Sequence, residues 1–159
     1  MTTVIETRDL YRYFGSDETE IVALDHVSVD IQEGEFTAII GPSGSGKTTL
    51  LHLIGGLDEP DGGSVKLSDT NIAEMNGNEL SDFRRDHIGF IFQAYNLIPV
   101  LSAEENIEYI MLLQGISPAE RKKRVQEMLA LVGLEGLGER RPAHLSGGQQ
   151  QRVAVARAM

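Results

Sequence analysis

The segment GPSGSGKT, residues 41–48, constrains the fold of this chain more than any other stretch. It fits the pattern G-x-x-x-x-G-K-[ST], in which glycines let the backbone curl until several N–H groups point at one anion. The apolar run Phe36–Ile40 precedes it and suits a strand buried on both faces, and Thr49–Gly56 after it suits a helix that ends at two glycines. Strand, glycine loop and helix in this order predict a site for the phosphates of a nucleotide.

Each side chain of this loop has an expected role. Lys47 should reach the β- and γ-phosphates, and the Thr48 hydroxyl should bind Mg²⁺. Thr49 is placed to touch the α-phosphate. The other candidate phosphate-binding residues are Gly41, Ser43, Gly44, Ser45 and Gly46. The loop alone cannot distinguish ATPases from GTPases or small-molecule kinases; the second motif described below does so and predicts ATP with Mg²⁺. The Asn-Lys-x-Asp pattern by which GTPases bind guanine is also missing.

Hydrophobic periodicity predicts an α/β section first and a helical section after it. Val27, Val29 and Ile31 alternate with polar residues as in a half-buried strand. Further predicted elements are a strand at Ser64–Leu67, a helix at Asn78–Asp86 and a second buried strand at Ile88–Phe92. We place the nucleotide-binding α/β core in residues 1–92 and a helical part in residues 93–159.

Three serines predict the starts of the later helices. Ser102, Ser117 and Ser146 are each followed three residues later by Glu or Gln, as in a capping box. The expected helices cover 103–114, 118–132 and the residues from 147 to the end of the chain.

Charge and composition exclude several classes of partner. The net charge of −10 argues against binding nucleic acid, which needs many Lys and Arg. There is no cysteine, which excludes disulfides and thiol chemistry, and no apolar run of about 18 residues that would span a membrane. We expect a cytoplasmic protein whose role at a membrane requires a membrane-spanning partner.

The stretch LSGGQ, Leu145–Gln149, is the second informative motif. By itself it is an ordinary capped helix, or an anion site with two glycines in its first turn. Together with the phosphate loop, LSGGQQQRVAVARA resembles the signature region of the ATP-binding domain of ABC proteins. Other stretches resemble the subgroup that drives lipoprotein release, macrolide export and the cell-division permease; they are GEFTAIIGPSGSGKTTLLHLIGGLDEP and HIGFIFQAYNLIPVLSAEENI.

The resemblance assigns roles to further residues. Gln93 matches the glutamine of the family's Q-loop, where it would bind Mg²⁺ and sense the attacking water, so Lys47 and Gln93 are the catalytic candidates. Tyr13 matches the aromatic residue that stacks on adenine, with Tyr11 and Phe14 as close competitors.

The resemblance also implies a fold and an assembly. The fold would be a P-loop NTPase of ABC type, with a parallel-sheet core and a helical signature subdomain. Two copies, or a copy and a close relative, would dimerise head to tail with ATP between them. The signature residues would then hold the γ-phosphate of ATP bound to the partner; they are Ser146, Gly147, Gly148 and Gln149. The dimer would drive a membrane permease from the inner face of the cell membrane.

The family's strand that ends in Asp-Glu, its Walker B motif, and its switch histidine have no counterpart before Met159. We therefore expect an incomplete core, and very slow ATP hydrolysis by these 159 residues alone. Two other functions stay open: a non-hydrolysing nucleotide-binding module, and a soluble ABC ATPase acting on DNA or ribosomes. The transported substrate cannot be inferred from this sequence.

Overall fold

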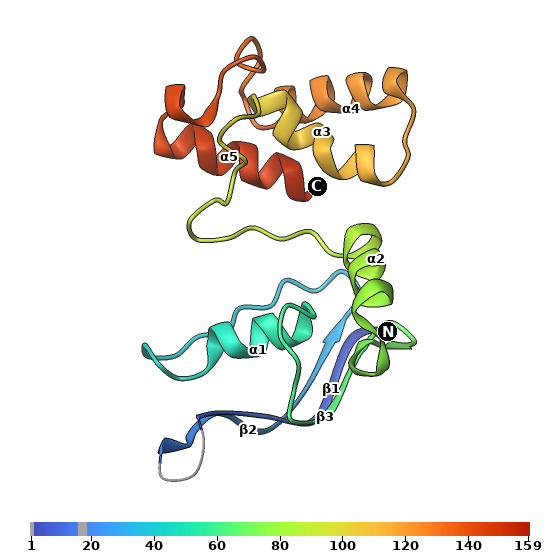
Figure 1. The fold of residues 1–159 in the computed structure, drawn as a ribbon, viewed down its shortest axis with the longest axis vertical. Helices are drawn as coiled ribbons and strands as arrows, with labels where there is room; N and C mark the ends of the chain where they lie inside the picture. Colours follow the sequence, from blue (N-terminus) through green and yellow to red (C-terminus); the bar gives the residue numbers. More distant parts are fainter. Residues whose placement is uncertain (1, 16–18) are drawn as a thin grey trace. The chain divides into compact units, whose positions relative to one another are not determined.

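The computed structural model describes residues 2–15 and 19–159, which form two compact units, Met1–Asp82 and Phe83–Met159. Figure 1 labels the main helices and strands. The division falls within helix α2 (Gly77–His87), whereas the sequence analysis places the boundary after Phe92.

An antiparallel sheet forms the first unit, in the strand order β2-β1-β3-β4. The strands are β1 (Thr3–Phe14), β2 (Ile21–Gln32), β3 (Gly62–Leu67) and β4 (Thr70–Asn71). Helix α1 (Lys47–Ile54) packs against the first three of them, and a short 3₁₀ helix, η2 (Ile72–Glu74), follows β4.

The core of this unit lies between the sheet and α1. Leu10 and Leu24 of the sheet are buried, and so are Leu50, Leu53 and Ile54 on the face of α1. Burying an aliphatic side chain of this size stabilises the fold by about 1.5–3 kcal/mol. The start of α1, and with it the phosphate loop, is therefore anchored to β1 and β2.

The runs Phe36–Ile40 and Ile88–Phe92 form no strand, contrary to the prediction from their apolar sequence. Phe36 is 98% exposed and Ile40 is 91% exposed. A strand needs a neighbour to complete its backbone hydrogen bonds, and no strand of the described residues pairs with either run. The α/β class is confirmed, but the predicted parallel-sheet core is replaced by the antiparallel sheet.

Three main helices make up the second unit: α3 (Ala103–Leu113), α4 (Pro118–Leu131) and α5 (Gly147–Ala158), with a 3₁₀ turn, η3 (Pro142–His144), before α5. Their facing sides form one apolar core that includes Ile107, Leu129 and Val153. This core joins α5, which carries the LSGGQ motif, to the other two helices.

The predicted helix starts are confirmed. Ser102 and Ser146 are N-caps in complete capping boxes, because each accepts a bond from the third helical residue and that residue's side chain accepts a bond from the serine N–H. Ser117 caps α4 by accepting from the N–H of Glu120 at 3.4 Å, with Pro118 at the first helical position.

Asn106 is a fully buried amide that shapes the segment before α3. Its Oδ1 accepts from the Ile98 N–H at 2.8 Å, and its Nδ2 donates to the carbonyl oxygens of Ile98, Leu101 and Ser102 at 3.1, 3.2 and 2.9 Å. A single side chain thus satisfies several backbone groups of residues 98–102.

Replacing Asn106 by Ala should lower the free energy of unfolding by about 2–4 kcal/mol, because it leaves buried backbone groups without partners. Urea unfolding followed by circular dichroism measures this. Asn78→Ala, at an exposed position of α2, is the control and should change little. Equal stability of the two variants would show that water replaces the amide.

Candidate functional site

The phosphate loop, residues 41–48, leads into the first turn of α1. Ser43 and Gly44 form its exposed turn. Gly46, the N-cap of α1, has a φ of 86° and makes no side-chain capping bond. A Cβ atom at Gly46 would lie 2.5 Å from the carbonyl oxygen of Ala23 in β2, so only glycine fits there. The first N–H groups of α1 have no partner within the helix and are the groups that bind phosphate in such loops.

The side chain of Lys47 turns back into the curve of the loop. Its Nζ donates to the carbonyl oxygens of Gly41 and Pro42 at 2.8 and 2.7 Å, and to Ser45 Oγ at 3.4 Å. Ser45 in turn packs on Gly41, where an added Cβ would lie 2.7 Å from its Oγ. These contacts hold a positive charge inside the loop, where phosphate oxygens would accept bonds from the same ammonium group.

Thr48 and Thr49 follow in the first turn of α1, with Thr48 exposed and Thr49 half-buried. The Thr48 hydroxyl fits a ligand of Mg²⁺, a cation that prefers oxygen. The described residues contain no group of three or more His, Cys, Asp or Glu side chains that could bind a metal by themselves.

The three aromatic candidates for stacking on a base lie at the end of β1, on two faces of the strand. The rings of Tyr11 and Tyr13 are 5.4 Å apart, and the Tyr11 ring also lies 4.9 Å from the ring of His26. The Phe14 ring lies 5.0 Å from the guanidinium carbon of Arg12. Tyr11 and Tyr13 therefore share one face of β1, and Arg12 and Phe14 share the other.

Phe14 lies on the face toward α1. Its neighbour Arg12 pairs across the strands with Leu24, and the Leu24 side chain is 3.7 Å from the Cβ position at Gly46. Phe14 itself pairs with Ile21 and is 42% exposed. The contacts thus bring Phe14 to the side of the sheet that holds the phosphate loop.

Tyr13 has acidic surroundings. Burial raises the pKa of its phenol, and the charges of Asp25 and Glu20 raise it further. Carboxylates around Tyr13 would repel the phosphates of a nucleotide. The exposed ring of Phe14 on the face toward α1 makes Phe14 a stronger candidate for the residue beside the base, and Tyr13 stays a prediction.

The LSGGQ motif forms the start of α5 in the second unit. Ser146 Oγ accepts from the Gln149 N–H at 3.3 Å, and Gln149 Oε1 accepts from the Ser146 N–H at 2.8 Å. Ser146, Gly147 and Gly148 are exposed, and an added Cβ at Gly148 would have a neighbour only at 4.0 Å. The helix start is therefore open to an anion, with the Ser146 O–H still free to donate.

Gln93 is exposed, in a turn whose next two residues are held by α5. Arg157 donates to the carbonyl oxygens of Asn96 and Tyr95 at 2.6 and 2.9 Å, and burial lowers the pKa of its guanidinium. Tyr95 and Asn96 both have left-handed backbones, with φ values of 60° and 48°. The sequence analysis missed Arg157, since its bonds reach more than 60 residues back along the chain.

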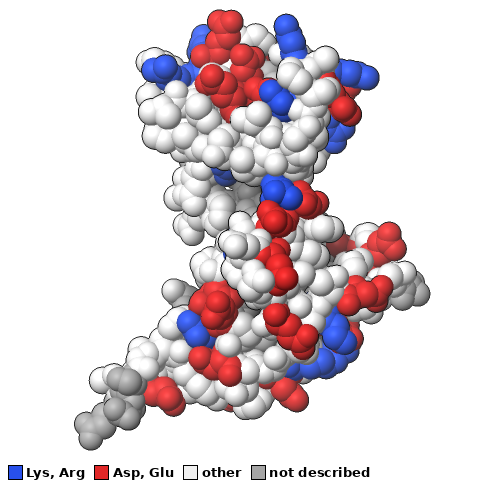
Figure 2. All heavy atoms as spheres, turned by 45° about the vertical axis from the view of Figure 1, so that its right-hand side comes forward, with Lys and Arg blue, Asp and Glu red and all other residues white. Residues whose placement is uncertain are grey.

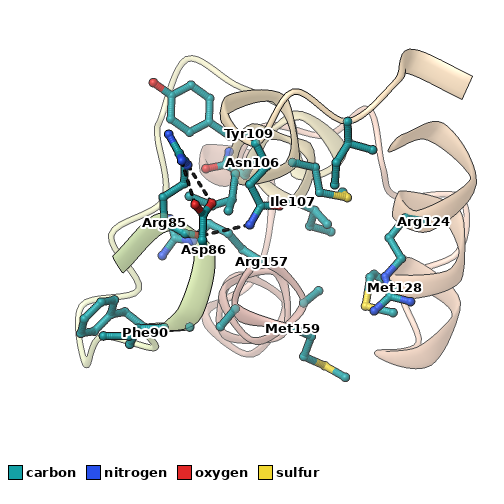
Figure 3. Close-up of a pocket in the computed structure, with 18 of the residues that line it drawn as sticks. Arg85, Asp86, Phe90, Asn106, Ile107, Tyr109, Arg124, Met128, Arg157 and Met159 are labelled. Atoms are coloured by element: carbon teal, nitrogen blue, oxygen red, sulfur yellow. Dashed lines mark hydrogen bonds and ion pairs between the residues drawn. The ribbon is translucent and has the colours of Figure 1, made fainter. Parts of the chain in front are cut away.

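A hollow of about 760 Å³ in the second unit is drawn in Figure 3. Arg157 and Asn106 line it together with Phe90 and residues of α3, α4 and α5. The predicted site residues therefore form two groups. The phosphate loop and the aromatic residues at the end of β1 belong to the first unit, and the Gln93 turn and the start of α5 belong to the second.

Comparisons of sequence and structure both match one group of proteins. The profile of the family described as "ABC transporter" matches residues 24–159. A macrolide export ATP-binding/permease protein, MacB, of Hyphomonas neptunium is 47% identical over 98% of this chain and 24% of its own length. An uncharacterized ABC transporter ATP-binding protein of Thermotoga maritima is 47% identical over 100% of this chain and 68% of its own.

The solved structures include a dimeric ATP-binding cassette, MJ0796, in a post-hydrolysis state with ADP and phosphate. It matches with a TM-score of 0.91 and 43% identity, over 98% of this chain and 68% of that one. The chain thus spans about a quarter of the MacB proteins and about two thirds of the shorter relatives.

Replacing Gly46 by Ala should destabilise the first unit by about 2 kcal/mol or more, because it forces a left-handed alanine against Ala23. It should also weaken nucleotide binding. Thermal unfolding and calorimetric titration with ATP measure the two effects. Gly77→Ala is the control, because an added Cβ at Gly77 would have open space around it. Equal stability and equal ATP affinity of the two variants would show that the close approach of β2 to Gly46 contributes to neither.

Proposed function

Because this chain belongs to the ABC transporter family, we propose that it is the ATP-binding part of a transporter, in which ATP joins two such domains and drives a membrane permease. The observation that carries this proposal is the presence of two open helix starts on one chain. One, at α1, holds a lysine inside a glycine loop, and the other, at α5, carries two exposed glycines behind a serine cap.

ATP would bind the first unit with its phosphates in the loop 41–48. The Lys47 ammonium group now donates to the carbonyl oxygens of Gly41 and Pro42. On binding ATP it would donate to oxygens of the β- and γ-phosphates instead. Thr48 would bind Mg²⁺ together with phosphate oxygens, and Thr49 would contact the α-phosphate. Mg²⁺ would neutralise phosphate charge. The role of Gln93 in binding Mg²⁺ and sensing the attacking water stays a prediction from the family resemblance.

The base would stack on Phe14. This ring is partly exposed and lies on the α1 side of β1, whereas Tyr11 packs against Gly62 and His26. Stacking of an adenine on an aromatic ring contributes about 1–3 kcal/mol. Tyr13 remains the alternative. Replacing each of the two rings by alanine in turn and measuring the affinity for ATP distinguishes between them.

The second open helix start would complete the site of a partner copy. The Ser146 O–H and the N–H groups of the exposed Gly147 and Gly148 suit a γ-phosphate, which in the proposed head-to-tail dimer would come from the other chain. MJ0796, a structural match, is a dimeric ABC transporter cassette. Head-to-tail pairing would make ATP binding and dimerisation one event.

A permease partner is suggested by the relatives. MacB is named as an ATP-binding/permease protein, and LolD of Chromohalobacter salexigens, 42% identical over 98% of this chain, as part of a lipoprotein-releasing system. Among the described residues, no helix has the length and apolar character to cross a bilayer. We propose that this part acts at the inner face of the cell membrane through the permease.

Charge favours a protein partner over a nucleic acid. The net charge is −10. On the face drawn in Figure 2, Asp and Glu are spread widely, and the described Lys and Arg form no continuous stripe. A DNA- or ribosome-bound ATPase would need such a stripe to neutralise phosphates.

Lys47→Ala should weaken ATP binding about ten- to hundredfold, since a charge-assisted hydrogen bond contributes about 1.5–3 kcal/mol. Calorimetric titration with Mg-ATP measures this. Lys66→Ala removes an exposed lysine that pairs with Glu6 on the same unit, and it should leave the affinity unchanged. An unaltered affinity of the Lys47 variant would refute the proposed phosphate site.

Ser146→Arg should abolish ATP-dependent dimerisation while ATP binding by the monomer persists, because the arginine would block the start of α5. Light scattering with and without ATP gives the test. Ser117→Arg removes an equivalent N-cap, at α4, and is the matched control. Dimerisation that survives in the Ser146 variant would rule out the composite site.

A further inference from the structure

Arg12 connects the aromatic end of β1 with the segment that follows α1. Its Nη2 lies 3.0 Å from Asp58 Oδ1, and its Nη1 lies 3.1 Å from Asp61 Oδ1. The second oxygen of Asp61 accepts the Tyr13 N–H at 2.7 Å. The end of β1 is thereby tied at two successive residues to the carboxylates that follow α1.

These ties hold the guanidinium against Phe14. The Arg12 Cζ lies 5.0 Å from the centroid of the Phe14 ring, within the range of a cation–π contact. The Arg12 side chain is 22% exposed, and its Nε is buried without a hydrogen-bond partner among the described residues. The two carboxylates and the ring, rather than full pairing of its N–H groups, therefore determine where the guanidinium lies.

The charge of Arg12 is already balanced. With two carboxylates at hydrogen-bond distance, the guanidinium offers little net attraction to a distant phosphate. Its geometry suits a fixed support for an aromatic ring instead, because a planar guanidinium stacks on a ring and binds two acceptors at its edge.

We propose that Arg12 is a positioning residue for the base of the bound nucleotide. It supports the Phe14 ring and ties it, through Asp58 and Asp61, to the segment that follows the helix whose start forms the phosphate loop. The platform for the base and the loop for the phosphates are then held at a constant separation. This inference rests on the proposed function, specifically on ATP binding with the base on Phe14.

The affinities for Mg-ATP and for inorganic tripolyphosphate, measured on the whole chain, test this role. Tripolyphosphate uses the loop but has no base. Arg12→Ala should weaken ATP binding roughly fivefold, as the loss of a cation–π support of about 1 kcal/mol implies, and leave tripolyphosphate binding unchanged. Arg12→Lys, which cannot bind both carboxylates through a planar fork, should show the same selectivity to a smaller extent.

Three further variants are the controls. Arg8→Ala removes another β1 arginine with two acidic partners, Asp30 and Glu6, and should alter neither affinity. Phe14→Ala should weaken ATP binding by itself, and adding Arg12→Ala to it should cause no further loss, because the arginine acts through the ring.

Each other outcome overturns the inference. Equal loss of both affinities would show that Arg12 only stabilises the fold, and an additional loss in the Phe14→Ala background would show that it acts by another route. If Arg12→Ala fails to fold, the affinities of Arg12→Lys for Mg-ATP and for tripolyphosphate provide the test instead. If the unaltered chain binds neither ATP nor tripolyphosphate, the proposed function fails as well. If it binds both, but the Arg12 variants do not show a selective loss of ATP affinity, the inference alone fails.

Discussion

The approach of the Ala23 carbonyl oxygen to Gly46 is the contact on which the first unit depends. It brings the start of α1 against β2 at a distance that admits no side chain. Once Gly46 is placed there with a left-handed backbone, Lys47 lies at the first position of the helix and turns back to the Gly41 and Pro42 carbonyl oxygens. The loop therefore takes its shape from contacts within the first unit, before any phosphate binds.

Features that depend on near neighbours in the chain were predictable. The N-caps Ser102, Ser117 and Ser146 each need only the residue three positions on, and all three form as expected. The glycine loop and its helix are also local in sequence. The roles of the loop and LSGGQ residues in binding ATP remain predictions, now supported by their exposure and geometry.

Features that depend on distant residues were not predictable in this way. Phe36–Ile40 has the composition of a buried strand, but composition cannot supply the neighbouring strand that its backbone requires. The support of Phe14 by Arg12 depends on Asp58 and Asp61, nearly 50 residues away, and the bonds from Arg157 to Tyr95 and Asn96 span more than 60. Alternation along β1 alone therefore could not rank Tyr11, Tyr13 and Phe14.

The exposed run Phe36–Ile40 has a consequence for how this chain behaves in solution. It combines bulky apolar side chains with backbone groups that no described strand pairs, and these are the properties of an edge that recruits a strand from another molecule. Self-association through this run would need no nucleotide and would grow with protein concentration. The proposed ATP-dependent pairing would then be measured above a background from residues 36–40, and a charge introduced there would lower that background without changing the helix starts.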